Sequence, residues 1–226
     1  MKVAADLVCA TAQGPTLSSV LPHLCYAGVL VNSSVPETPY EIEHWDRGVV
    51  LRLVSADGTN RLTRARVQAL TAAVERLAAR PPSRLVIAGN SHFFSAGADL
   101  NQIAALDGRE AFEFAQMGQR LMNAVASFPS PTVAAIHGYC MGGGLDLALA
   151  CHRRIAGSHA LFGHRGAALG LITGWGGTQR LPRLVGKARA LQMFLAAEKV
   201  HATAALQIGL VDAIAGDPVA KALECV

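Results

Sequence analysis

Short apolar runs that predict β-strands alternate with segments of helical periodicity from Gly48 onward, and this alternation constrains the fold most. The predicted strands cover residues 48–54, 84–89, 131–136 and 153–157, and the predicted helices cover 63–80, 108–128 and 142–151. The run 131–136 is apolar throughout, as expected for a strand that is covered on both faces. Strands that alternate with helices predict an α/β fold with a mostly parallel sheet and right-handed crossovers.

Composition excludes several other classes of protein. Hydrophobic residues make up 51% of the 226 residues, so most of the chain is not disordered. Charged residues amount to 16%, too few for a coiled coil. The net charge of +4 is scattered along the chain, which suits a small anionic ligand better than nucleic acid. The histidines show no metal-ligand spacing, so we expect no metal site.

Cysteine usage and hydropathy predict the compartment. The five cysteines are odd in number and include no CxxC pair, which favours a reducing compartment over a disulfide framework. The most apolar run, 132–151, contains His137, four glycines and Asp146, so it does not predict a membrane span. We therefore expect a cytoplasmic protein that binds neither membrane nor nucleic acid. Residues 1–40 show no periodic pattern of apolar residues. We expect them to form an N-terminal extension to a core of residues 41–226.

Two glycine-bearing loops are the candidate functional segments. Residues 93–100 and 137–146 each follow an apolar strand, and ligands bind beyond the carboxyl ends of parallel strands. Glycine lets the backbone approach a ligand closely, and residues 142–144 would offer unpaired amides at the start of a helix. Two amides that converge from separate loops would form an oxyanion hole. Either loop alone would equally suit a tight turn.

Together these loops resemble the enoyl-CoA hydratase/isomerase (crotonase) family. Residues 94–100 and 138–148 are similar to two signatures of that family, and residues 161–163, 169–171, 176–182 and 204–211 are similar to later blocks in order and spacing. The resemblance covers roughly Val49 to Ile214. It implies a crotonase-like (ClpP/crotonase) α/β fold, a repeated β-β-α superhelix with mostly parallel sheets. It also implies that the usual C-terminal helices are short or missing here.

The resemblance further implies an acyl thioester of coenzyme A as substrate. The amides of Ala98 and Gly143 would hold its carbonyl oxygen and stabilise an enolate. Residues that match substrate-contacting positions of the family are Ala96, Ala98, Asp99, Leu100, Gly142, Gly143, Gly166 and Trp175. Coenzyme A would be part of the substrate, with no permanently bound cofactor, and the protein would assemble as a homotrimer or hexamer.

The acid–base residues depart from the pattern of the family. Asp146 lies one helical turn after Gly143 and would act as the proton carrier, where hydratases of the family usually carry a glutamate. Gly166 occupies the position of a second catalytic glutamate, which argues against ordinary hydration. His164 is a candidate substitute, because a histidine titrates near neutral pH. A double-bond isomerase needs only one carboxylate and remains compatible with Asp146 alone.

Two alternative functions stay open. Gly166 and the short tail also fit a non-catalytic acyl-CoA binding or scaffold protein. Cys140 and His164 could form the thiol–imidazole pair of a hydrolase, because Clp protease, of the related fold, has a serine where Cys140 lies.

Overall fold

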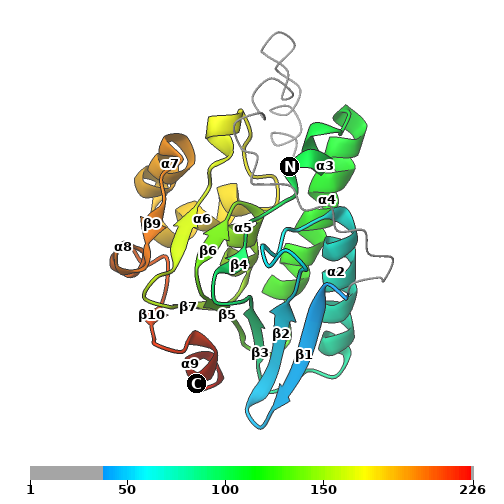
Figure 1. Cartoon of the computed structure of the whole chain (residues 1–226), viewed down its shortest axis with the longest axis vertical. Helices are drawn as coiled ribbons and strands as arrows, with labels where there is room; N and C mark the ends of the chain where they lie inside the picture. The colour runs from blue at the N-terminus through cyan, green and yellow to red at the C-terminus, as the bar shows by residue number, and fades with distance from the viewer. Residues whose placement is uncertain (1–37, 225–226) are drawn as a thin grey trace.

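A computed structural model describes residues 38–224 of the chain (Figure 1). Its larger sheet has six strands in the order β1-β2-β3-β5-β7-β10. These strands are β1 (Tyr40–Trp45), β2 (Gly48–Leu53), β3 (Leu85–Ala88), β5 (Thr132–Ile136), β7 (Arg153–Ala156) and β10 (Ala213–Ile214). Only the β1–β2 pair is antiparallel, so the predicted parallel sheet is confirmed.

A smaller sheet carries the second strand of each repeat. Its order is β4-β6-β8-β9, and its strands are β4 (Phe93–Ser95), β6 (Tyr139–Met141), β8 (Leu161–Gly163) and β9 (Val200–His201). Strands β4, β6 and β8 run parallel, and β9 is antiparallel to β8. Along the chain β3 and β4, β5 and β6, and β7 and β8 form successive pairs, and helical structure follows each pair. This is the expected repeated β-β-α arrangement.

The helices begin and end at recognisable sequence signals. They are α2 (Arg64–Ala79), α3 (Leu100–Ala104), α4 (Gly108–Ala126), α5 (Gly143–Ala150), the 3₁₀-helix η3 (Gly166–Leu169), α6 (Gly177–Val185), α7 (Lys187–Ala196), α8 (Ala202–Gln207) and α9 (Pro218–Glu224). Thr63 caps α2, while Asp107 and Glu110 form a capping box on α4. Helix α5 is apolar apart from Asp146 and is buried from Gly144 to its last residue, as expected for a helix inside the core.

The central strands of the larger sheet are buried on both faces. Along β2, Val49, Leu51 and Leu53 point into the core shared with α2, α4 and α5, whereas Val50 points to the opposite face. Ala222 and Leu223 of α9 cover that opposite face, and α2 and α4 lie side by side (Figure 1). Burial on both faces explains why β3 and β5 read as continuous apolar runs.

The sequence missed several short elements. It predicted no strand at β1, β4, β6 or β8. Strands β4, β6 and β8 have three residues each, which is too short to show a period of two. Residues 1–37 of the predicted extension lie outside the described residues, and β1 begins at its last residue, Tyr40. No described helix is long and apolar enough to cross a membrane.

Candidate active site

The two glycine-bearing loops meet because β4 and β6 are neighbouring parallel strands. A Cβ atom placed on Gly143 would lie 3.3 Å from the amide nitrogen of Ala98, and one placed on Gly97 would lie 3.1 Å from the amide nitrogen of Gly143. Within residues 38–224, neither the Ala98 amide nor the Gly143 amide donates a hydrogen bond. Two unpaired backbone donors from segments far apart in sequence therefore lie side by side.

Glycine is required at this junction for two reasons. Gly97 and Gly142 have φ angles of +93° and +50°, which side chains rarely tolerate. A Cβ atom on Gly97 would also lie 2.6 Å from the carbonyl oxygen of Met141. The close approach of the two loops thus depends on missing side chains.

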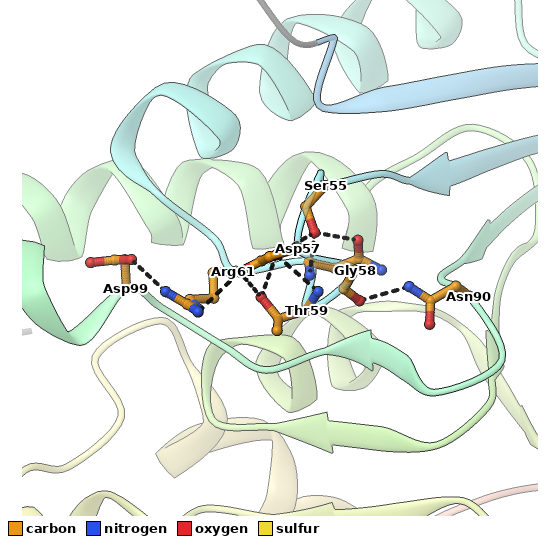
Figure 2. A network of polar contacts seen from close by, with 8 residues as sticks. Ser55, Asp57, Gly58, Thr59, Arg61, Asn90 and Asp99 are labelled. Atoms are coloured by element: carbon orange, nitrogen blue, oxygen red, sulfur yellow. Dashed lines mark hydrogen bonds and ion pairs between the residues drawn. The ribbon is translucent and has the colours of Figure 1, made fainter. Parts of the chain in front are cut away.

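The loop that carries Ala98 is held by the segment before α2. The Ala96 amide donates to the Thr59 carbonyl at 2.9 Å, and the Leu62 amide donates to the Gly97 carbonyl at 2.8 Å. Figure 2 shows the polar contacts that surround this pairing. Arg61 bridges Asp57 at 2.9 Å and Asp99 at 3.8 Å, so it ties the two segments together by charge.

Asn60 organises the same segment from inside. It is 1% exposed and has a φ of +52°. Its side-chain amide donates to the carbonyls of Phe93 and Phe94 at 3.0 and 3.3 Å. Its own carbonyl accepts from the Ser95 hydroxyl, which in turn accepts from the Gly97 amide. Sequence reasoning missed Asn60, although Asn after a Gly-Thr turn is a signal for a positive φ.

Asp146 is a buried carboxylate one turn into α5. It is 1% exposed, and its Oδ2 accepts a hydrogen bond from the Thr173 hydroxyl. Its Oδ1 lies 3.5 Å from Nε2 of His164. Burial raises the pKa of Asp146 from 3.8 to about 7, against the opposing influence of Thr173 and Arg180. A carboxyl with this pKa can gain or lose a proton at neutral pH.

His164 follows β8 and faces Asp146. Burial lowers the pKa of His164 from 6.5 to about 4, so its imidazole is neutral at pH 7. Asp146 Oδ1 and His164 Nε2 are buried without a hydrogen-bond partner among the described residues. Gly177 leaves room for this pair, since a Cβ atom there would lie 2.2 Å from Oδ1 of Asp146.

Trp175 borders the same place. Its side chain is buried, and a Cβ atom placed on Gly143 would lie 2.5 Å from the indole ring. The structure therefore brings together Ala98, Gly143, Asp146, His164 and Trp175. The remaining predicted residues lie around them. Ala96 and Gly142 precede the two amides in the chain, Asp99 caps α3, and Leu100 is 39% exposed.

Gly166 begins η3 and packs against the loop that follows. A Cβ atom there would lie 2.7 Å from the carbonyl oxygen of Leu171, whose amide donates to the Gly166 carbonyl at 2.8 Å. A larger side chain at this position would require the loop to move. Sequence reasoning also missed Thr173, for which no local pattern exists. Gly177 and Arg180 lie in the block 176–182 that resembles the family, but no role was predicted for them from the sequence.

Cys140 offers little as a nucleophile in this structure. It is fully buried, and burial raises its pKa well above 9.0, so the thiolate is disfavoured. Cys140 and Cys151 are both free thiols. No group of three or more His, Cys, Asp or Glu within residues 38–224 could hold a metal ion.

A groove of about 630 Å³ lies elsewhere, between α2 and α4. Its lining includes Glu75, Gln119, Arg120 and Asn123, and none of the five residues brought together above. Because the groove lies away from those residues, we place the candidate site at the meeting of the two loops.

Comparison with known proteins assigns the family. The model of the family described as enoyl-CoA hydratase/isomerase matches residues 48–224. The chain belongs to the enoyl-CoA hydratase/isomerase family. This confirms the resemblance and the crotonase-like fold predicted from the loops and the later blocks.

Individual known proteins are similar to large parts of the chain. A probable enoyl-CoA hydratase of Bacillus subtilis (strain 168) is 48% identical over 134 residues, which are 59% of this chain and 52% of that protein. The match thus spans about half the length of that relative. A structure of Pseudomonas aeruginosa DspI is 37% identical with a TM-score of 0.79, covering 85% of this chain and 75% of that one. The structure of an enoyl-CoA hydratase from Bacillus anthracis is 30% identical with a TM-score of 0.78, and the match covers 82% of this chain and 74% of that one.

Proposed function

We propose that the protein acts on acyl thioesters of coenzyme A and stabilises an enolate. The observation that carries this proposal is the pair of adjacent, unpaired amides of Ala98 and Gly143. Placed on a thioester carbonyl, the two donors would stabilise the negative charge that forms on its oxygen. A preorganised donor of this kind lowers a barrier by about 3–4 kcal/mol. The family supports the thioester as substrate, and no permanent cofactor is needed.

Asp146 is the proposed proton carrier. It lies on the helix that begins at Gly143, so it faces the carbons next to a carbonyl held there. Its pKa of about 7 matches a group that takes a proton and returns it at neutral pH. The neutral imidazole of His164, 3.5 Å away, would share that proton with the carboxyl group.

A single carboxylate favours isomerisation over hydration. Asp146 would remove a proton from the α-carbon of a 3-enoyl thioester, leaving a dienolate whose charge rests on the carbonyl oxygen. The same proton returned to the γ-carbon gives the 2-enoyl thioester, with no water consumed. Hydration would need a second group to activate water, and Gly166 cannot supply it.

Turnover of crotonyl-CoA and a 3-enoyl-CoA tests the proposal. We expect isomerisation of the 3-enoyl thioester to exceed hydration of crotonyl-CoA. Asp146→Asn should lower kcat by about 10²–10⁴-fold. The matched control is Glu113→Gln, a half-exposed carboxyl on α4, which should leave kcat unchanged. Absence of turnover on both thioesters, or an active Asp146→Asn protein, would contradict the proposal.

A second candidate is a non-catalytic acyl-CoA binding protein, favoured by the packing of Gly166 against Leu171. Calorimetry with a saturated acyl-CoA separates the two functions. Binding without turnover supports the second candidate, and absence of binding excludes both. The infrared C=O band of a bound thioester should move to lower frequency if the two amides donate hydrogen bonds to its carbonyl oxygen. The expected homotrimer or hexamer is tested by light scattering of the full chain.

A further inference from the structure

Trp175 fills the space between two helices at the candidate site. Its residue is 4% exposed. A Cβ atom on Gly118 of α4 would lie 2.1 Å from Nε1 of the indole, and one on Gly143 of α5 would lie 2.5 Å from Cζ3. The ring therefore rests on two glycines, one from each helix, and occupies the volume that their side chains would take.

Contacts on several sides fix the ring in place. Nε1 donates to the Phe114 carbonyl at 3.3 Å, and the Phe114 and Trp175 rings are 5.3 Å apart between centroids. Arg180 donates to the Trp175 carbonyl at 3.3 Å, and Gln119 donates to the Gly174 carbonyl at 2.8 Å. Both the indole and its backbone are thus attached to neighbouring helices.

Gly143 links this ring to the proposed chemistry. The same residue supplies one of the two amides and one of the two surfaces on which the ring lies. An acyl group whose carbonyl is held at Gly143 therefore starts next to the indole. We propose that Trp175 limits the length of the acyl chain, so that the protein prefers short-chain thioesters. This inference rests on the proposed function.

A series of straight-chain 3-enoyl-CoA substrates from 3-butenoyl to 3-decenoyl tests the limit. For the unmodified protein, kcat/KM should fall as the chain lengthens. Trp175→Leu should raise the ratio of kcat/KM for the longest substrate to that for the shortest by roughly tenfold or more, since each accommodated methylene contributes at least that much. Trp175→Phe, which keeps an aromatic ring against Phe114, should give an intermediate shift.

Tryptophan fluorescence gives a readout that does not depend on turnover. Trp45 and Trp175 are the only tryptophans. Trp45 is 53% exposed on the β1–β2 hairpin, so Trp45→Phe should leave the chain-length profile unchanged and make Trp175 the sole emitter. In that protein, short saturated acyl-CoA thioesters should perturb the emission at lower concentration than long ones.

The outcomes separate this inference from the proposed function. Equal losses on all chain lengths in Trp175→Leu and Trp175→Phe would show a purely structural role and overturn it. A preference of the unmodified protein for long chains would overturn it as well. Absence of turnover combined with short-chain selectivity in the fluorescence titration would reject the enzymatic proposal and retain the length limit.

Discussion

The carboxyl group of Asp146 is costly to ionise because the fold removes it from water. Its proposed role as a base requires the ionised form, so protonation should switch activity off. We expect kcat/KM to rise by about tenfold per pH unit up to an apparent pKa of about 7 and then to level off. The measurement is a pH–rate profile with a 3-enoyl-CoA. A rise centred near pH 4 would instead indicate a carboxyl that is well solvated in the working enzyme.

Gly177 tests how tightly the Asp146–His164 pair is packed. Gly177→Ala would place its Cβ atom 2.2 Å from Oδ1 of Asp146, so the carboxylate must shift. We expect kcat to fall by at least tenfold. Gly174→Ala is the matched control, because its nearest neighbour would be Cβ of Ala115 at an ordinary 3.6 Å. Equal activity of the two variants, measured with the same substrate, would show that the position of Asp146 is not critical.

Asn60 combines a left-handed backbone with buried side-chain hydrogen bonds. Asn60→Gly and Asn60→Ala both remove the bonds to the Phe93 and Phe94 carbonyls. Only alanine adds backbone strain at a φ of +52°. Urea denaturation should therefore find Asn60→Ala less stable than Asn60→Gly by about 1–2 kcal/mol. Equal stabilities would mean that the backbone relaxes away from the left-handed region.

At the scale of elements, Arg154 connects β7 to the turn that precedes β10. Its guanidinium donates to the carbonyls of Leu210 and Cys151 at 2.8 and 2.9 Å and to Asp212 at 3.2 Å. Arg154→Ala would remove the donor from the Leu210 and Cys151 carbonyls, while Asp212 keeps its hydrogen bond from the backbone amide of residue 154. The variant should lower the free energy of unfolding by about 2–5 kcal/mol. The adjacent Arg153 is exposed, and Arg153→Ala should change it by less than about 0.5 kcal/mol. Similar losses in the two variants would contradict the connecting role.

At the scale of the whole molecule, Asp146 and His164 couple folding to pH with opposite signs. The pKa of Asp146 is raised on folding, so its contribution to stability is lost as pH rises from 3.8 through about 7. The pKa of His164 is lowered on folding, so its contribution is lost as pH falls from 6.5 through about 4. The two effects oppose each other between these limits.

Single variants should reveal each effect. Asparagine at position 146 does not ionise, so Asp146→Asn lacks the destabilisation that the unmodified protein suffers as pH rises. The free energy of unfolding of Asp146→Asn, relative to the unmodified protein, should therefore increase between pH 5 and 7. Glutamine at position 164 does not take up a proton, so His164→Gln lacks the destabilisation that the unmodified protein suffers as pH falls. Its free energy of unfolding relative to the unmodified protein should therefore increase as pH falls from 6.5 toward 4. Thermal unfolding across this pH range provides the measurement. Parallel curves for the three proteins would contradict the burial of both groups.

The sequence by itself determined the strands β2, β3, β5 and β7, the helices α2, α4 and α5, the two glycine-bearing loops and the position of Asp146 one turn after Gly143. These features are local, because hydrophobic periodicity, glycine positions and helical spacing can each be recognised within one short segment of the sequence. Tertiary structure alone decided that Ala98 lies beside Gly143, that His164 faces Asp146 and that Trp175 rests on Gly118. Each of these contacts joins segments whose proximity depends on the order of strands and the packing of helices. Burial, and with it the proton affinity of Asp146, belongs to the assembled surroundings and not to any stretch of sequence.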